Sequence, residues 1–426
     1  MWPRAKTRVE RRRVFYIPGY DPYPPRRYRE LYRTESAKQA GISGYAIQQK
    51  ALQGDTGWKV RADIEGERTL SRVDVLVWHD LVKSSMSGTV GATYLNLVRT
   101  AWLYLSTGVF RRLSWLAKGP VIAALYPIAM LLLQLFLATV IAGVAGSAVA
   151  FAITRGGEAV LALMGRTVPL WLGVTVGAAA FWGVFLPALV TGLRWFRAHD
   201  DKTYAYDLRN DYAYTASERG AYPAEIEARL HEFRHRIEAA LREDIDEVLV
   251  VGHSSGAHLA VSVIADIIRL RRVPDRGPAL SLLTLGQVIP MVSFLPKARR
   301  LRRDLRLLST SEEITWVDVS APGDGCSFAL SDPVAVSGVA PSKGKQWPLI
   351  LSAAFSKTLS PELQKSLKWR FFRLHFQYLC AFDRPGDYDY FKITAGPRTL
   401  GARFRGRRPS ASRIDVPASR FTSIVR

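Results

Sequence analysis

Residues 247–270 read EVLVVGHSSGAHLAVSVIADIIRL, and this stretch decides how the rest of the chain is interpreted. Its first part, residues 247–251, is a short run rich in valine, which is typical of a buried strand. Residues 257–270 have the length and the apolar content of a buried helix. Only Gly-His-Ser-Ser-Gly at 252–256 joins the two, so the sequence predicts a strand, a tight turn and a helix.

Segments on both sides of this stretch continue the alternation of strand and helix. Further strands are predicted at residues 14–17, 58–64, 73–78, 282–285, 314–319 and 369–374. Further helices are predicted at residues 25–40 and 223–242. Such alternation implies an α/β fold, in which a mostly parallel sheet carries helices on both faces. With 426 residues, of which 48% are hydrophobic, the chain can bury a large core and is not disordered as a whole.

Two long uncharged stretches interrupt this pattern. Between Lys118 and Arg155 lie 36 consecutive uncharged residues, and between Arg166 and Arg194 another 27. A helix needs roughly 20 residues to cross the hydrocarbon core of a bilayer, and soluble core helices rarely run so long without a charge. Since the link between the stretches is short, residues 119–195 predict a transmembrane helical hairpin inserted into the α/β domain.

The basic residues around the hairpin predict its orientation. Six Lys or Arg residues lie on the outer flanks and two on the link. Those on the flanks are Arg111, Arg112, Lys118, Arg194, Arg197 and Lys202, and those on the link are Arg155 and Arg166. Because positive charge favours the cytoplasmic side, we expect both flanks and both termini to be cytoplasmic. Residues 1–13 are basic but lead into no apolar run, so no secretory signal is expected.

Three further segments are candidates for contact with lipid. Residues 93–118 interleave tryptophan and leucine with arginine, which is typical of an interfacial helix, although an ordinary core-facing helix shows the same pattern. Residues 295–308 are cationic with regularly spaced leucines, which indicates either a cap segment lying on anionic headgroups or a solvated helix face. Residues 398–426 hold eight arginines and one aspartate among Ser, Pro and Gly, which predicts a disordered tail.

Net charge and cysteine content limit the partners. Lys and Arg number 59 against 37 Asp and Glu, a net charge of +22, which favours anionic partners. Because the basic residues are scattered and no recognition module is visible, membrane lipid is expected as the partner and nucleic acid is not. Cys326 and Cys380 are too few for a disulfide framework or a four-ligand zinc site, and we expect no metal or organic cofactor.

The turn at residues 252–256 fits the pattern Gly-x-Ser-x-Gly. A serine on a sharp turn from strand to helix needs small neighbours, and its hydroxyl then lies at the end of the sheet beside a helix N-terminus that favours negative charge. The segment resembles the nucleophile elbow of the α/β-hydrolases, the lipase and esterase superfamily. The alternative is a structural turn without chemistry. The resemblance extends over both flanks and leaves the hairpin as an insertion.

This resemblance implies a catalytic triad in the order serine, acid, histidine. It makes Ser254 the nucleophile. Of the seven histidines, His375 lies well downstream of the elbow, and it is therefore the expected base. Asp324 is the expected acid, because it stands in a Pro/Gly turn just after the strand predicted at 314–319. Asp318 and Asp332 remain possible acids.

The resemblance also implies an oxyanion hole built from two backbone N–H groups. One belongs to Ser255, the residue after the nucleophile. The other should come from the loop after an early strand, where Pro18-Gly19-Tyr20 follows residues 14–17 and makes Tyr20 the expected donor. Pro18 replaces the histidine that is commoner there, and a plain Pro-Gly turn is the alternative.

Together these features predict a membrane-anchored serine hydrolase that cleaves an ester, most simply a lipid or acyl ester. Its hydrolase domain would consist of residues 1–118 and 196–397, separated by the hairpin at 119–195 and followed by the tail at 398–426. A thioesterase or peptidase would use the same triad. A catalytically silent scaffold on the same fold is an alternative from another class.

Overall fold

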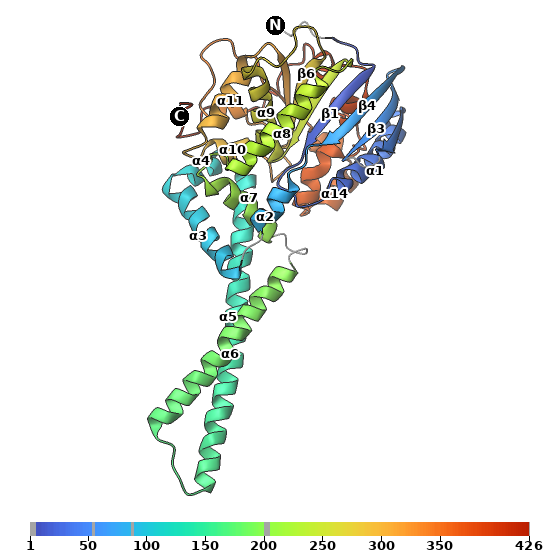
Figure 1. Ribbon diagram of the computed structural model, residues 1–426. Helices are drawn as coiled ribbons and strands as arrows, with labels where there is room; N and C mark the ends of the chain where they lie inside the picture. The colour runs from blue at the N-terminus through green and yellow to red at the C-terminus, as the bar shows by residue number, and fades with distance from the viewer. Residues whose placement is uncertain (1–5, 53–55, 87–88, 200–204, 426) are drawn as a thin grey trace. The chain divides into compact units, whose positions relative to one another are not determined.

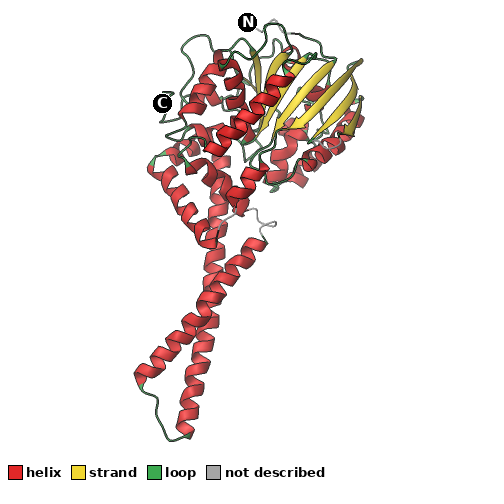
Figure 2. Cartoon of the chain, in the orientation of Figure 1, coloured by secondary structure: helices red, strands yellow, loops and turns green. Residues whose placement is uncertain are grey.

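The computed structural model describes residues 6–52, 56–86, 89–199 and 205–425. Its centre is an eight-stranded sheet with the strand order β2-β3-β4-β1-β5-β6-β7-β8 (Figures 1 and 2). The strands are β1 (Arg11–Ile17), β2 (Ala46–Ala51), β3 (Gly57–Ile64), β4 (Glu67–Val75), β5 (Glu247–His253), β6 (Ala279–Leu285), β7 (Ile314–Ser320) and β8 (Leu349–Ser352).

The sheet is mostly parallel, as the sequence predicts. β1 pairs in parallel with β4 on one side and with β5 on the other, and β5 to β8 follow in parallel. Only β3 runs antiparallel to its two neighbours among the described strands. Val14 of β1 lies in register with Leu249 of β5, so segments from both sides of the long apolar helices form one sheet.

Helices flank the sheet, and the described ones fall into a long apolar pair and a set of shorter helices. The shorter ones are α1 (Arg26–Ser43), α2 (His79–Met86), α3 (Val90–Ser106), α4 (Val109–Leu116), α7 (Ala205–Ser217), α8 (Ala224–Ala240), α9 (Gly256–Arg269), α10 (Ile289–Ser293), α11 (Arg299–Thr310), α12 (Pro333–Val336), α13 (Phe355–Thr358), α14 (Pro361–Leu367), α15 (Phe371–His375), α16 (Tyr390–Ala395), α17 (Leu400–Arg403) and the 3-10 helix η2 (Phe376–Leu379).

Both faces of the sheet are buried at its centre, whereas β2, β3 and part of β4 expose one face. Val14 and Tyr16 of β1 belong to a core cluster that also contains Tyr28 and Tyr32 of α1. The residues that alternate with them in β1 are just as buried, because the other face is covered as well. α9 packs against β5, β6 and β1. All seven residues of β5 are buried, as expected of a valine-rich central strand.

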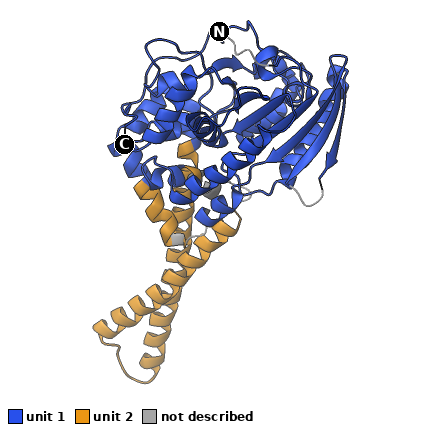
Figure 3. Ribbon diagram, turned by 45° about the horizontal axis from the view of Figure 1, so that its top comes forward, with its two compact units in different colours: residues 1–85, 100–123, 212–426 blue, residues 86–99, 124–211 orange. Residues whose placement is uncertain are grey.

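The chain divides into two compact units (Figure 3). The first contains residues 1–85, 100–123 and 212–426, and therefore the whole sheet. The second contains residues 86–99 and 124–211, and therefore most of the long helices α5 (Lys118–Leu163) and α6 (Leu170–Ala198). Both helices are long and apolar enough to cross a membrane, and their most apolar windows are largely exposed.

Small residues let the two long helices approach each other. A Cβ atom on Gly146 of α5 would lie 3.0 Å from the backbone oxygen of Phe181 in α6. A Cβ atom on Gly177 of α6 would lie 3.1 Å from the Thr154 Cγ2 atom in α5. Close packing through glycine is typical of helix pairs in lipid, where burial of apolar surface gives no driving force.

The segment predicted as one interfacial helix forms two. α3 and α4 are separated at Gly108, whose φ of 72° lies in the left-handed region that glycine adopts without strain. Val109 and Leu113 of α4 are buried, whereas Trp115 is exposed. The helix is therefore amphipathic and packs on the protein with its apolar side, while an aromatic side chain remains on the surface.

Two basic segments differ from their predicted roles. Residues 295–308 do not form a cap: they include most of α11, which packs against α9 with Leu301 and Leu305 buried. Arg302 is fully buried and donates hydrogen bonds to the backbone oxygens of Ser293 and Leu295. The helix is a layer of the α/β fold because Leu301 and Leu305 face the core and Arg302 is held inside the protein.

The tail at residues 398–425 is ordered, so its predicted disorder is wrong. The Leu400 N–H donates to the Glu247 carboxylate at 2.7 Å, and the Ser410 N–H donates to the Ile350 oxygen at 2.8 Å. Further along, the Ile414 N–H donates to the Leu330 oxygen at 2.8 Å. Composition predicted disorder because the segment is rich in Arg and Ser, but its backbone groups and its few apolar side chains find partners on the domain.

Candidate active site

Ser254 stands on the turn between β5 and α9, where the sequence predicts it. Its φ of 55° lies in the left-handed region, which L-residues other than glycine rarely adopt and which costs on the order of 1 kcal/mol. The Ser254 N–H donates to the Leu285 oxygen at the end of β6 at 2.9 Å. His253 and Ser255 are buried on either side of Ser254, whose own side chain is partly exposed. The strained turn therefore holds a serine hydroxyl accessible at the end of the sheet.

The two glycines of the motif are required by close packing. A Cβ atom on Gly252 would lie 2.8 Å from the Ala257 Cα atom in the following helix. A Cβ atom on Gly256 would lie 2.2 Å from the backbone oxygen of Ile17 and 2.4 Å from that of Pro18. Glycine at 256 thus allows α9 to begin directly against the end of β1.

The loop after β1 lies against the serine. A Cβ atom on Gly19 would lie 2.9 Å from the Ser254 Cβ atom and 3.4 Å from its Oγ atom. The indole Nε1 atom of Trp78 donates to the Pro18 oxygen at 2.9 Å and so holds the loop. Tyr20 follows directly, and its side chain turns towards α2, where its hydroxyl lies 2.5 Å from the Ser85 Oγ atom. The structure therefore brings the predicted loop, and Tyr20 within it, next to Ser254.

His375 and Asp324 form a buried pair. The Nδ1 atom of His375 lies 2.8 Å from the Oδ2 atom of Asp324. The Tyr378 hydroxyl donates to the same Oδ2 atom at 2.9 Å, and the Cys326 N–H donates to Oδ1 at 2.9 Å. Burial alone raises the pKa of Asp324, but the charge and the hydrogen bond of His375, together with the Cys326 N–H, outweigh it and hold this pKa below its ordinary value. Asp324 is therefore a carboxylate at neutral pH.

The two alternative acids lie elsewhere. Asp318 is inside β7, where it accepts a hydrogen bond from the Thr284 hydroxyl at 2.5 Å, and burial raises its pKa to about 8. Asp332 accepts the N–H groups of Val334 and Ala335 at the start of α12 and pairs with Lys345. Neither is bonded to His375, so Asp324 is the acid that the geometry favours.

The sequence predicts a strand at residues 369–374, just before His375. This prediction is wrong, because His375 lies on the short helix α15. That run alternates apolar and basic residues over too short a length to separate strand from helix. The Nε2 atom of His253 lies 3.1 Å from the His375 backbone oxygen, and the two imidazole rings lie 4.8 Å apart. Burial, followed by repulsion from His375, lowers the pKa of His253 to about 3, so His253 is neutral and donates from Nε2.

His375 and Ser254 both lie by the end of β6. A Cβ atom on Gly286 would lie 3.1 Å from the His375 Cε1 atom, and the preceding residue, Leu285, accepts the Ser254 N–H. The Nε2 atom of His375 is buried and has no hydrogen-bond partner among the described residues. A hydrogen bond from the serine hydroxyl is thus not formed in this structure, and Nε2 is open to accept a proton.

Sequence reasoning missed two residues that hold the pair. Tyr378 supports Asp324, and its hydroxyl also accepts the Ala321 N–H at 3.0 Å, which ties η2 to the turn after β7. His253 lies within the elbow motif, too near Ser254 in sequence to be the expected base, and its contact with the His375 backbone was not foreseen. Tyr378 lies three residues after His375, and this helical spacing from a candidate base is the signal that could have drawn attention to it.

Asp324 and His375 also belong to a group of side chains that could hold a metal ion. With Cys326 they place three potential donor atoms within 4.8 Å of one another. Burial and then the charge of Asp324 raise the pKa of the Cys326 thiol well above its ordinary value, and metals bind the thiolate. The Nδ1 and Oδ2 atoms are moreover already joined by a hydrogen bond. The donor set therefore fits a hydrogen-bonded pair better than a metal site.

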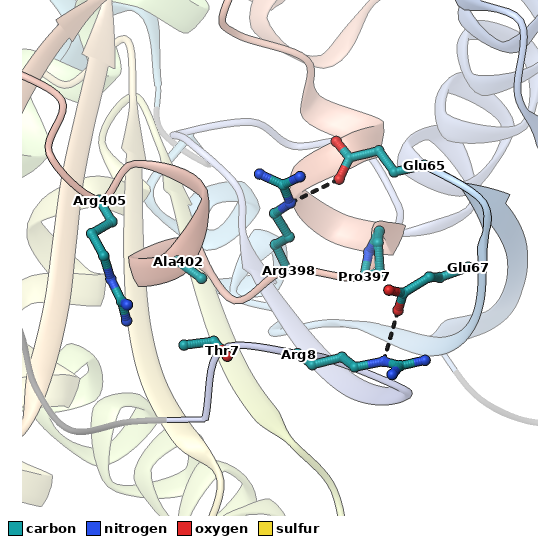
Figure 4. A pocket seen from close by; sticks show the side chains of 8 residues that line it. All are labelled: Thr7, Arg8, Glu65, Glu67, Pro397, Arg398, Ala402 and Arg405. Atoms are coloured by element: carbon teal, nitrogen blue, oxygen red, sulfur yellow. Dashed lines mark ion pairs between the residues drawn. The ribbon is translucent and has the colours of Figure 1, made fainter.

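A pocket of about 350 Å³ lies at the other end of the strands, beside the start of β1 (Figure 4). It is lined by Thr7, Arg8, Glu65, Glu67, Pro397, Arg398, Ala402 and Arg405. Arg8 pairs with Glu67 at 2.7 Å and Arg398 with Glu65 at 3.0 Å, so most of its charge is neutralised internally. β1 begins beside this pocket and ends beside the elbow. The pocket is thus separate from Ser254 and supplies none of its chemistry.

A second buried histidine near the elbow makes stability depend on pH. Burial lowers the pKa of His258 to about 3, whereas the unfolded chain titrates near 6.5. Below pH 6.5 the unfolded state takes up a proton that the folded state does not, so stability falls as the pH falls. From pH 7 to pH 5 this residue should cost about 2 kcal/mol.

His258→Asn removes this titration and can keep the contact of Nδ1 with the Tyr222 hydroxyl. We expect the variant to lose less thermal stability between pH 7 and pH 5 than the wild type, measured by the unfolding midpoint in detergent. Equal pH dependence in wild type and His258→Asn would contradict a neutral, buried His258.

Comparison with known proteins returns no matching family model, no matching curated protein and no matching solved structure. The candidate site therefore depends on the geometry around Ser254. Of the predicted residues, Asp324 and His375 are hydrogen-bonded to each other and lie near Gly286, next to the residue that accepts the Ser254 N–H. Ser255 follows Ser254 at the start of α9, and Tyr20 stands on the loop that lies against Ser254.

Proposed function

We propose that this chain is a membrane-anchored serine hydrolase of the α/β-hydrolase type that cleaves a lipid or acyl ester. The observation that carries the proposal is Ser254 on a strained turn between β5 and α9, beside a buried histidine–carboxylate pair. A surface serine on an ordinary turn does not require a left-handed backbone. It also does not require glycine on both sides, as the close packing at Gly252 and Gly256 does here. The same arrangement is what nucleophilic catalysis by a serine requires.

In the proposed reaction Ser254 Oγ attacks the ester carbonyl carbon while His375 Nε2 takes the hydroxyl proton. Asp324 holds the tautomer in which Nδ1 is protonated and stabilises the imidazolium that forms. The backbone N–H groups of Tyr20 and Ser255 receive the oxyanion. His375 then gives its proton to the leaving alcohol, and the C–O bond breaks to leave an acyl-enzyme. Water, deprotonated by His375, hydrolyses this ester and releases the acid and Ser254.

The preference for a lipid or acyl ester follows from the membrane anchor. α5 and α6 would hold the catalytic domain at a bilayer, where ester lipids are concentrated. The excess of Lys and Arg on the flanks over the link favours a cytoplasmic position for both flanks. No side chain is assigned to recognition of the acyl chain, so thioesters and amides are tested beside oxygen esters.

Replacing Ser254 with alanine should abolish both covalent labelling by a fluorophosphonate and hydrolysis of p-nitrophenyl esters. The reason is that the attacking Oγ atom of Ser254 is removed, whereas the turn remains because alanine carries the same Cβ atom. The full-length protein is assayed after reconstitution in lipid vesicles. Ser255→Ala is the matched control, because its hydroxyl is not the proposed nucleophile and its backbone N–H is kept.

Two results would overturn the assignment. Labelling that persists in Ser254→Ala would identify another nucleophile. Hydrolysis that survives Ser254→Ala, is lost in a chelator and returns with zinc would instead assign the reaction to the Asp324, Cys326 and His375 cluster.

A catalytically silent scaffold is the second candidate, and one observation favours it. The His375 Nε2 atom has no hydrogen-bond partner among the described residues, so the serine and the histidine are not joined here. Catalytic hydrogen bonds are often long before substrate binds, which is why hydrolysis remains the first proposal. Absence of labelling in folded, membrane-inserted wild-type protein would favour the scaffold.

A further inference from the structure

Two of the basic segments that the sequence offered for contact with lipid, α11 and the tail, are partly engaged within the protein. In α11, Arg300 pairs with Asp266 at 2.6 Å and Arg302 is buried. In the tail, Arg398 and Arg403 both pair with Glu65. A surface that binds anionic headgroups needs cations that are exposed and not already neutralised.

A short segment that the sequence had not offered also meets this requirement. Residues 365–373 join the end of α14 to α15 and read KSLKWRFFR. Their four cations are exposed, and none forms an ion pair with a residue that the structure describes. These cations are Lys365, Lys368, Arg370 and Arg373. Two of the three aromatic side chains between them are also on the surface: Trp369 is 76% exposed and Phe371 is 48% exposed.

The backbone holds Trp369 in this exposed position. Its φ of 66° lies in the left-handed region, which is a strained conformation for a bulky side chain. The ammonium group of Lys368 lies 5.8 Å from the indole ring, over its face. The apolar indole is not buried within the domain, although burial would remove it from water. Its exposure on a strained turn therefore indicates a partner outside the domain.

This segment lies beside the start of the apolar helix α5. A Cβ atom on Gly119 would lie 3.0 Å from the Gly325 Cα atom, and a Cβ atom on Gly325 would lie 3.5 Å from the Phe371 Cδ1 atom. From Gly119 onward α5 has no charge before Arg155, and Ile122, one turn along, is already exposed. A bilayer that takes up α5 from its first turns therefore reaches the segment 365–373.

We propose that residues 365–373 form a docking loop that binds the anionic headgroup layer of the membrane, with Trp369 lying in the interface. Tryptophan suits this boundary because its ring is apolar and its N–H is polar, while the flanking cations meet lipid phosphates and carboxylates. The inference deepens the proposed function and rests on it for its catalytic meaning: the loop leads directly into His375, so docking presents the site to ester lipids.

Docking can be measured without turnover. Trp369→Cys, in full-length protein that also carries Cys326→Ser and Cys380→Ser, is labelled with an environment-sensitive nitrobenzoxadiazole probe. The protein is reconstituted in vesicles of phosphatidylcholine alone and in vesicles that also contain phosphatidylserine. We expect a blue shift and quenching by spin-labelled lipid in the anionic vesicles, and loss of both in high salt. Lys368→Glu with Arg370→Glu should lower the docked population at least about tenfold.

The matched control is Arg405→Glu with Arg408→Glu, which makes the same change of charge on exposed arginines of the tail. It should leave the quenching unchanged. Equal quenching in both vesicle types, none in either, or an equal effect of the two charge reversals overturns the proposal. The readout needs no catalysis, and repeating it with Ser254→Ala separates a failure of docking from a failure of the proposed hydrolase.

Discussion

Asp324→Asn is expected to lower kcat for ester hydrolysis by roughly 10⁴, with little change in KM. Two donors other than His375, the Tyr378 hydroxyl and the Cys326 N–H, already point at the Asp324 carboxylate. The Cys326 N–H meets Oδ1, whereas the Tyr378 hydroxyl and His375 Nδ1 both meet Oδ2. An amide that keeps its oxygen for the Cys326 N–H therefore turns its NH₂ group towards His375 Nδ1. The imidazole then carries its proton on Nε2, where it cannot accept one from Ser254. Steady-state kinetics with a soluble p-nitrophenyl ester in reconstituted vesicles would measure the loss.

Asp318→Asn is the matched control. Burial raises the pKa of Asp318 to about 8, so this group is already neutral at pH 7 and an amide of the same shape should be tolerated. We expect its kcat to stay within a few fold of wild type. If Asp318→Asn were as inactive as Asp324→Asn, or if Asp324→Asn kept most of its activity, the assignment of the acid would be wrong.

The centre of the fold could be predicted from sequence because its signals are local. β5 is a run of valines buried on both faces, α9 is apolar along its length, and the turn between them carries two glycines that the packing requires. The long uncharged helices were predictable for the same reason, since length and charge are properties of the chain itself.

The elements that were missed depend on contacts between distant parts of the chain. β2 has no apolar run and lies at the edge of the sheet, where pairing with β3 is its main support. The tail is missed for the same reason, since its N–H groups bond to backbone oxygens far away in sequence, such as those of Leu330 and Ile350. Composition describes the solubility of such a segment but not whether its N–H groups will find partners.

The candidate site contains residues that local sequence signals identify and residues that only contacts in the fold identify. Ser254 was identified by its neighbours in sequence, and His375 by elimination among seven histidines, but three aspartates could serve as acid. Only the geometry separates them: Asp324 is bonded to His375, Asp318 is buried and neutral, and Asp332 caps a helix. Residues that hold the pair, such as Tyr378, carry no motif and become visible only with the fold.

Gly256→Ala is expected to destabilise the protein by about 3 kcal/mol or more and to abolish fluorophosphonate labelling. The added Cβ atom would lie 2.2 Å from the Ile17 oxygen and 2.4 Å from the Pro18 oxygen. Both obstacles are backbone atoms at the end of β1, so no side chain can rotate away and the clash must move α9, the elbow or the loop that carries Gly19. Each of these movements displaces Ser254 from His375 or from the proposed oxyanion hole.

Gly41→Ala provides the comparison, because it adds the same methyl group to the exposed face of α1 with no atom within 4 Å. Alanine there should stabilise the protein by about 0.5–1 kcal/mol, since it reduces the freedom of the unfolded chain and favours the helix. The thermal midpoint and the extent of labelling are measured for both variants in the same vesicles. The signs differ because the added Cβ atom meets backbone at position 256 and open space at position 41. A Gly256→Ala protein as stable and as reactive as wild type would mean that α9 does not begin against β1, and the elbow geometry on which Ser254 depends would have to be abandoned.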